Sequence, residues 1–310
     1  MKKTDVFSEK PAPSFVMDTS VRSTGYQRFH PVSAAVHLLS CMVLLMFSTN
    51  PVICGLGWIS GLSMCLLLRR GRTQWSYYLW SIILGLAVIL TNPLITHRGN
   101  TVLFFVNSNP FTLEAVFFGV YMAVILTAVL FWCRVWNTVM STDRIMFILQ
   151  KTLPKASLVL TGALRFFPLL ADRWRQIRRA QLATGEEGRG IRAAAAQFSS
   201  LVTWSMEHAI GAAASMRTRG YGLKGRKSYT NFRFTGQDLF LLIYTIVLTG
   251  LTGWMMGTGA LSYSFYPVTP PVSLTVQALT GYVCYGCLAL FPTFFELGDM
   301  LFWTFLRRKI

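Results

Sequence analysis

A glycine-rich stretch at residues 220–228 is the first place where this sequence could bind a phosphate group. Residues 220–225 match the G-x-G-x-x-G pattern of a dinucleotide-binding loop, and residues 225–228 nearly complete a P-loop. A P-loop needs its lysine directly after the last glycine so that the amine reaches the β- and γ-phosphates, but Arg226 stands between Gly225 and Lys227. A dinucleotide-binding loop must follow a strand, whereas this stretch follows an alanine-rich helical pattern. The sequence therefore argues against nucleotide binding by this chain.

The other chemically suggestive residues do not assemble into a catalytic or metal-binding pattern. Glu207 and His208 could act as an acid–base pair, but neighbouring helical residues point about 100° apart, so a solvated or interhelical polar pair is the better interpretation. Cys284 and Cys287 have the spacing of a redox or metal site, yet they lie in an apolar run, which favours packing. We therefore expect no catalytic residue, no cofactor site and no metal site in this chain. A membrane-bound enzyme that uses Glu207 and His208 is the least favoured alternative.

Two long basic helical patterns in the middle of the chain share the same kind of ending. The first runs over residues 154–185 and ends in Ala183-Thr184-Gly185, and the second runs over residues 191–220 and ends in Thr218-Arg219-Gly220. An exposed arginine at a helix end can place its guanidinium in an acidic groove of a partner, while the following glycine lets the backbone turn away. Binding to anionic lipid headgroups is the alternative, but it does not explain why two successive helices end alike.

Both patterns are amphipathic, and each helix would be roughly 40 Å long. Pro154 suits the first turn of the first helix, Pro168 should kink it, and Gly185 can cap its end. Alanine-rich faces let helices approach closely. We therefore expect a crossed pair whose glycine ends project together at the cytoplasmic surface.

The composition of the whole chain is that of a membrane protein. Hydrophobic residues make up 53% of it and charged residues 13%, and the mean hydropathy is +0.46, so we predict an all-α polytopic membrane protein. About six transmembrane helices are expected, at residues 33–49, 52–68, 75–95, 111–132, 239–256 and 272–290. The predicted organisation is a loosely ordered N-terminal tail (1–32), four transmembrane helices (33–134), a cytoplasmic helical domain (135–236), two transmembrane helices (237–292) and an interfacial or cytoplasmic C-terminal tail (293–310). Glu114, near the outer end of the fourth span, is expected to lie at the membrane interface.

The distribution of charge predicts the topology. The formal net charge is +17, and 17 of the 29 Lys and Arg residues lie between Arg134 and Arg233. With six spans, every basic cluster lies on one side of the membrane and Arg98 lies outside, as the positive-inside rule requires. Both termini are therefore expected in the cytoplasm, and the charge does not indicate nucleic-acid binding.

The two helix endings, taken in order, resemble those of the transmembrane T component of energy-coupling-factor (ECF) transporters, an EcfT/CbiQ-like family that includes cobalt and nickel permease subunits. The segments that carry the resemblance are Leu164–Pro168, Arg179–Gly185, Ala213–Tyr221, Asn92–Leu94 and the helix start at Leu153-Pro154. The likeness covers residues 28–258. In this family, two cytoplasmic coupling helices each end in an Ala-Arg-Gly-type motif, and each motif docks in a groove of one ATPase subunit.

The resemblance implies a non-catalytic coupling scaffold of an ABC importer in the bacterial plasma membrane. It would join two ABC-type ATPases, the same or different, to a small membrane-embedded S component that binds a vitamin or a transition-metal ion. ATP and Mg²⁺ would bind to the ATPases and not to this chain. The implied ATPase-coupling residues are Ala183, Thr184, Gly185, Thr218, Arg219 and Gly220, supported by Arg165, Pro168, Arg179, Gln181, Met216 and Tyr221.

One position departs from the family pattern. Thr184 stands where the family usually has arginine. A threonine cannot form a bidentate ion pair, so either Arg179 or Arg189 replaces that contact, or the groove of that ATPase is less acidic. The alternative function is an autonomous secondary transporter, for which His37 is a lone intramembrane candidate.

Overall fold

The computed structural model describes residues 25–68, 75–96, 99–106, 109–183, 191–221, 223, 232–266 and 270–309. The chain divides into two compact units. In the described residues, one lies within residues 145–223 and the other within residues 25–144 and 232–309. We call the described parts of these the helix-pair unit and the membrane unit, respectively.

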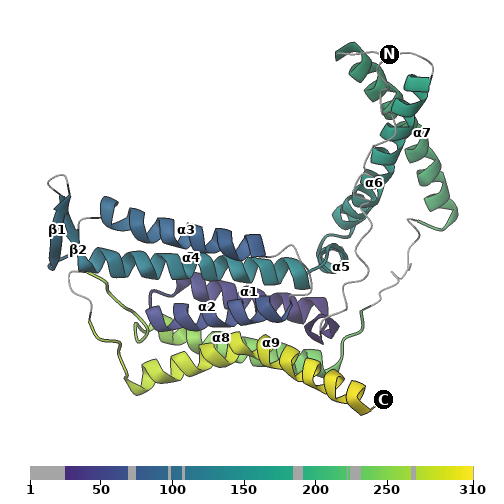
Figure 1. The fold of residues 1–310 in the computed structure, drawn as a ribbon. Helices are drawn as coiled ribbons and strands as arrows, with labels where there is room; N and C mark the ends of the chain where they lie inside the picture. Colours follow the sequence, from purple (N-terminus) through teal and green to yellow (C-terminus); the bar gives the residue numbers. More distant parts are fainter. Residues whose placement is uncertain are drawn as a thin grey trace. The chain divides into compact units, whose positions relative to one another are not determined.

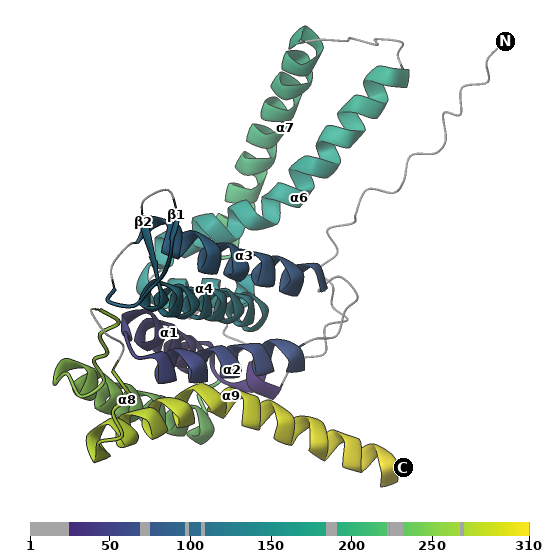
Figure 2. The same ribbon diagram turned by 60° about the vertical axis from the view of Figure 1, so that its left-hand side comes forward.

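Six apolar helices build the membrane unit, which makes the protein an all-α polytopic membrane protein. They are α1 (Pro31–Phe47), α2 (Pro51–Leu67), α3 (Trp75–Ile95), α4 (Leu113–Val139), α8 (Gly236–Gly257) and α9 (Val276–Lys309). Within the described residues, α3, α4, α8 and α9 are long and apolar enough to cross a membrane, and α1 and α2 are shorter apolar helices of 17 residues each. The helices form three layers, in which α1 and α2 lie between the α3–α4 pair and the α8–α9 pair (Figures 1 and 2).

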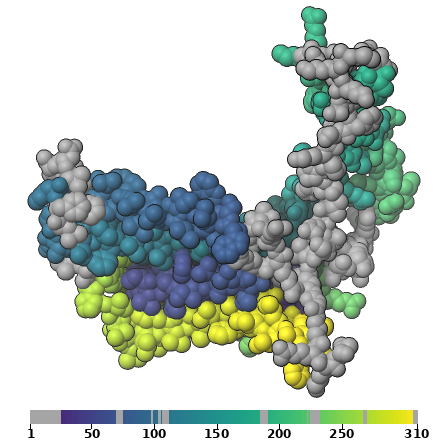
Figure 3. Space-filling model, viewed as in Figure 1, coloured from purple at the N-terminus to yellow at the C-terminus, as the bar shows by residue number. Residues whose placement is uncertain are grey.

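Helix α2 lies at the centre of this arrangement because its glycines allow close packing. The N–H of the Trp132 indole, on α4, donates a hydrogen bond of 3.0 Å to the carbonyl oxygen of Gly57. A Cβ atom added to Gly61 would lie 3.2 Å from side-chain atoms of Phe131 and Trp132. On the surface shown in Figure 3, α3 (blue), the α1–α2 hairpin (purple) and α9 (yellow) lie side by side.

Proline and a polar cap start both helices of the α1–α2 hairpin. Pro51 opens α2, and the Asn50 side chain caps it by accepting the N–H of Val52 at 3.0 Å. Asn50 also donates to the Tyr282 hydroxyl of α9 at 2.8 Å. The turn at Asn50-Pro51 thus also connects the hairpin to α9.

A β-hairpin precedes α4, between the third and fourth spans predicted from the sequence. Strands β1 (Val102–Val106) and β2 (Asn109–Thr112) pair antiparallel. Glu114, in the first turn of α4, is 3% exposed and accepts the N–H of Thr101 at 3.2 Å. Its carboxylate therefore holds the start of the hairpin against α4, which accounts for a burial that an interfacial position did not predict.

The two ends of the membrane unit also differ from the expected tails. Residues 293–309 continue α9 through Pro292 as one helix, and neighbouring helices can accommodate such a proline in a membrane protein. At the other end, Gly25–Arg28 form a short 3₁₀ helix, η1, in which Tyr26 is fully buried. The expectation of a loosely ordered tail is therefore wrong for residues 25–30.

Three helices lead into and form the helix-pair unit. Helix α5 (Thr142–Thr152) begins in the membrane unit and continues into the helix-pair unit, where α6 (Pro154–Ala183) and α7 (Ile191–Thr218) follow. Helix α6 begins at Pro154, as predicted, and the Ser157 hydroxyl near its start donates to the carbonyl oxygen of Met146 at 3.3 Å. The helices α6 and α7 run as a crossing pair in the view of Figure 1.

Candidate partner-docking site at the ends of α6 and α7

A Schellman motif closes α7 and leaves Arg219 exposed at its end. The N–H of Tyr221 donates to the carbonyl oxygen of Met216 at 3.0 Å, and the N–H of Gly220 donates to that of Arg217 at 3.0 Å. Gly220 has φ of +75°, a left-handed conformation that suits glycine. The chain therefore turns away directly after Arg219, whose side chain is exposed. This is the geometry that a guanidinium needs to enter a groove on another protein.

Replacing Gly220 should loosen this helix end. In Gly220→Ala the left-handed φ costs about 1 kcal/mol, and the added Cβ would lie 3.1 Å from Leu223 Cδ1. We expect the Tyr221 amide to exchange with solvent deuterium roughly fivefold faster than in the wild type. Gly211→Ala in the same helix is the matched control, because a Cβ there meets nothing within 4 Å. Equal exchange of the Tyr221 amide in both variants would contradict the role of Gly220.

Only part of the corresponding ending of α6 can be described. Ala183 is the last residue of α6 and is exposed, while Thr184 and Gly185 lie outside the described residues. Just before this end, the Gln197 amide of α7 donates a hydrogen bond of 2.7 Å to the side-chain oxygen of Gln181. Gln181 therefore joins the end of α6 to the beginning of α7.

A stack of rings joins the middle of α6 to α7. The rings of Phe166 and Trp204 lie 6.0 Å apart with planes 6° from parallel, and the His208 ring lies 5.4 Å from Phe166 and 5.2 Å from Trp204. The Arg173 guanidinium lies 5.3 Å from the centre of the Trp204 ring. The His208 ring thus contacts α6 through ring stacking, while the side chains of both Glu207 and His208 are exposed. Sequence reasoning missed Trp204, although its spacing of four residues from His208 places both rings on one helix face.

The contacts between α6 and α7 show that the pair is antiparallel. Gln181, late in α6, meets Gln197, early in α7, whereas Phe166, earlier in α6, meets His208, later in α7. The two C-terminal ends therefore lie at opposite ends of the pair, separated by roughly 40 Å of helix axis. The described end of α6 at Ala183 and the end of α7 at Arg219 thus lie apart, contrary to the expectation that the two endings project together, while Gly185 itself lies outside the described residues.

The pair carries a large uncovered apolar surface. No residue of α7, which the structure describes over its whole length, is buried. Ile191 is 90% exposed and Ile210 72%, and Phe167 on α6 is 74% exposed. Exposed apolar surface of this extent on a basic helix pair indicates an interaction surface.

The supporting residues predicted from the sequence lie along the same two helices. Arg165 and Arg179 are exposed on α6, and Pro168 lies inside that helix. Met216 and Tyr221 are partly exposed and form the backbone bond that closes α7. In the part of the chain that the structure describes, no three His, Cys, Asp or Glu side chains gather to hold a metal ion.

Comparison with known proteins finds similarity to membrane transport proteins. A family model described as a cobalt transport protein, CbiQ, matches residues 23–229 of the chain. The energy-coupling factor transporter transmembrane protein EcfT of Lactobacillus helveticus (strain DPC 4571) is 36% identical over 111 residues. That match covers 34% of this chain and 40% of the relative, so it spans less than half the length of either protein.

Proposed function

Because the chain belongs to the CbiQ family of cobalt transport proteins, we propose that it is the coupling subunit of an ECF-type importer, joining two cytoplasmic ATPases to a membrane-embedded S component. The antiparallel α6–α7 pair is the observation that carries this proposal. It has two endings roughly 40 Å apart along the pair, which suits one ending per ATPase subunit. Arg219 at one end is exposed and fixed by the Schellman motif.

The motion of the ATPases would be passed to the S component through α6 and α7, which would move together. When the ATPases bind ATP and close, the two docked endings move, and the Phe166–Trp204–His208 stack keeps the helices together at their crossing. The exposed apolar side chains of the pair, such as Ile210, offer a surface on which the S component can rest. The chain would then convert closure of the ATPases into displacement of the S component. ATP and Mg²⁺ would bind to the ATPases, and this chain would do no chemistry.

The transported substrate would be a micronutrient, a vitamin or a transition-metal ion, and the S component would select it. The test is affinity purification of the tagged chain from its native membranes in mild detergent, followed by mass spectrometry of the proteins and small molecules that accompany it. Two ABC-type ATPase chains and one small membrane protein are the expected companions. A purified chain that transports a substrate without any ATPase would overturn the proposal in favour of an autonomous secondary transporter.

A separate prediction concerns Thr184, in the ending Ala183-Thr184-Gly185 that follows α6 in the sequence. Thr184→Arg restores the residue type that the family pattern has there, so retention of the ATPases in rising salt should be equal to that of the wild type or stronger. Thr161→Arg is the control, because Thr161 is an exposed residue of α6 remote from the ending. Weaker retention in Thr184→Arg than in Thr161→Arg would count against docking by this ending.

A further inference from the structure

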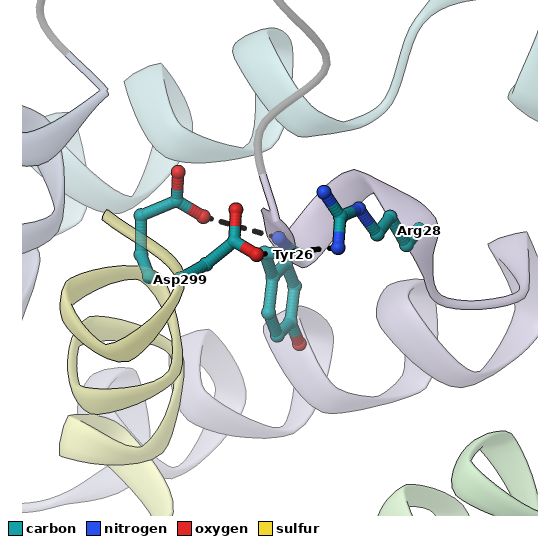
Figure 4. Close-up of polar contacts among 4 residues, drawn as sticks. Tyr26, Arg28 and Asp299 are labelled. Carbon is teal, nitrogen blue, oxygen red and sulfur yellow. Dashed lines mark hydrogen bonds and ion pairs between the residues drawn. The ribbon is translucent and has the colours of Figure 1, made fainter. Parts of the chain in front are cut away.

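A six-residue segment before α1, residues 25–30, is held by α9 on one side; we call it the strap. The N–H of Tyr26 donates to Glu296 Oε2 at 3.1 Å, and the Arg28 guanidinium pairs with Asp299 at 3.2 Å (Figure 4). A Cβ atom added to Gly25 would lie 2.9 Å from the Cβ of Asp299, so the strap backbone lies directly against α9. Both acidic residues lie beyond the residues that match the family model.

On its other side the strap is held by Arg144. This buried guanidinium donates from Nη2 to the carbonyl oxygens of Gln27 and Phe29, the latter at 3.2 Å. These carbonyl oxygens lie at the C-terminal end of η1, where a positive charge is favourable. Burial lowers the pKa of the Arg144 guanidinium. The two carbonyl contacts of Nη2 replace part of the water that it has lost, while Nη1 has no hydrogen-bond partner among the described residues. The same guanidinium lies 5.9 Å from the centre of the Phe232 ring.

Arg144 and Phe232 have a particular place in the chain. Arg144 is the last residue of the membrane unit before the chain enters the helix-pair unit, and Phe232 is the first residue after it returns. The chain therefore leaves and re-enters the membrane unit at two points that are in contact with each other.

The strap also contacts the two membrane helices next to these points. The Gln27 amide donates to the carbonyl oxygen of Thr138 near the end of α4, at 2.9 Å. The His30 N–H donates to Asp238 Oδ1 in the first turn of α8, at 2.5 Å. Six residues thus connect α4, α5, α8 and α9, which come from widely separated parts of the sequence.

We propose that Arg144 and the strap form a clasp that fixes two points of the membrane unit, Arg144 and Phe232, against α4, α8 and α9, so that motion reaching these points is passed to α8 and α9. If the chain were flexible at Arg144 and Phe232, motion would be lost there. A packed connection at these residues would pass it on. Arg144 is a positioning residue in this scheme, and Glu296 and Asp299 make α9 part of the coupling path. The role in transport rests on the proposed function; the positioning itself does not.

The test measures the distance between the two units by electron–electron resonance of paired nitroxide labels on the full chain in lipid nanodiscs. The labels are placed at the exposed residues Ser76 on α3 and Ser199 on α7, after replacement of the more accessible native cysteines Cys133, Cys284 and Cys287 by serine. Arg144→Met should broaden the distance distribution relative to the wild type. Lys151→Met, an exposed position on the same helix, should leave it unchanged.

A charge exchange keeps the proposal testable even if Arg144→Met does not fold. Arg28 and Asp299 are a partly exposed pair, so Arg28→Glu and Asp299→Arg should each broaden the distribution, and the double variant should restore it. A loss caused by either substitution by itself, and not by the broken pair, would not be repaired by the second change. Unchanged distributions in both single variants, with folded protein, would overturn the clasp.

The same samples separate failure of the clasp from failure of the proposed function. With the ATPases added, the clasp variants should retain them, because Arg219 is intact, but should lose the shift in distance that ATP produces in the wild type. If the wild type binds no ATPase, the proposed function fails, while the distances in the isolated chain still decide for or against the clasp. Loss of ATPase binding in the charge-exchange double variant would contradict the inference that the clasp and the docking ends act separately.

Discussion

Arg219→Glu should abolish retention of the ATPases by this chain. The Schellman motif at Gly220 holds Arg219 at the exposed end of α7, so the reversed charge would be held in the same position against an acidic groove. Loss of a charge-assisted contact of this kind costs at least about 3 kcal/mol, or roughly 100-fold in Kd. Affinity purification at moderate salt, with the ATPases quantified by mass spectrometry, measures the effect.

The matched control is Arg217→Glu, which changes the net charge equally two residues earlier. Arg217 is also exposed but lies inside the last turn of the helix, so its side chain points to a different side. We expect at most a modest loss of retention there. If both reversals weaken binding to the same extent, the interaction depends on net charge and not on the position of the Arg219 guanidinium, and the groove-docking model fails.

Local sequence signals predicted the helix pair well. Pro154 marks the first residue of α6, and Gly220 marks the turn that closes α7, because each residue type has a backbone preference that acts without tertiary contacts. The membrane helices were equally visible as long apolar runs. The β-hairpin was not, because its two strands are short and residues 111–112 continue the apolar pattern of α4.

Features that depend on distant contacts were not predictable in this way. The opposite placement of the two endings follows from the antiparallel pairing of Phe166 with His208 and of Gln181 with Gln197, which helix periodicity alone does not set. The clasp depends on Arg144 and on carbonyl oxygens more than 100 positions earlier in the chain. From the sequence alone, Arg144 cannot be told apart from the exposed basic residues around it, because its burial depends on the fold.

Gly57→Leu should destabilise the membrane unit by about 3 kcal/mol or more, the upper part of the range for overpacking a core. A single Cβ atom at this position would lie 2.7 Å from Leu45 Cδ1 on α1 and 2.7 Å from the Tyr285 hydroxyl on α9. The Gly57 carbonyl oxygen also accepts the indole N–H of Trp132 on α4. A leucine here would therefore push α2 away from α1 and α9 and disturb the hydrogen bond to α4. Thermal unfolding of the purified chain in detergent, followed by circular dichroism, measures the loss.

Gly55→Leu tests whether the effect comes from packing or from the loss of glycine in a membrane helix. Gly55 lies two residues earlier on α2, where an added Cβ meets nothing within 4 Å. The two variants add the same side chain to the same helix, so differences in helix propensity and hydrophobicity cancel. The unfolding midpoint of Gly55→Leu should match or exceed that of the wild type, since leucine favours a helix more than glycine does. Similar losses in both variants would mean that α2 is not the central packing element of the membrane unit, because contact of Gly57 with α1 and α9 is what distinguishes the two positions.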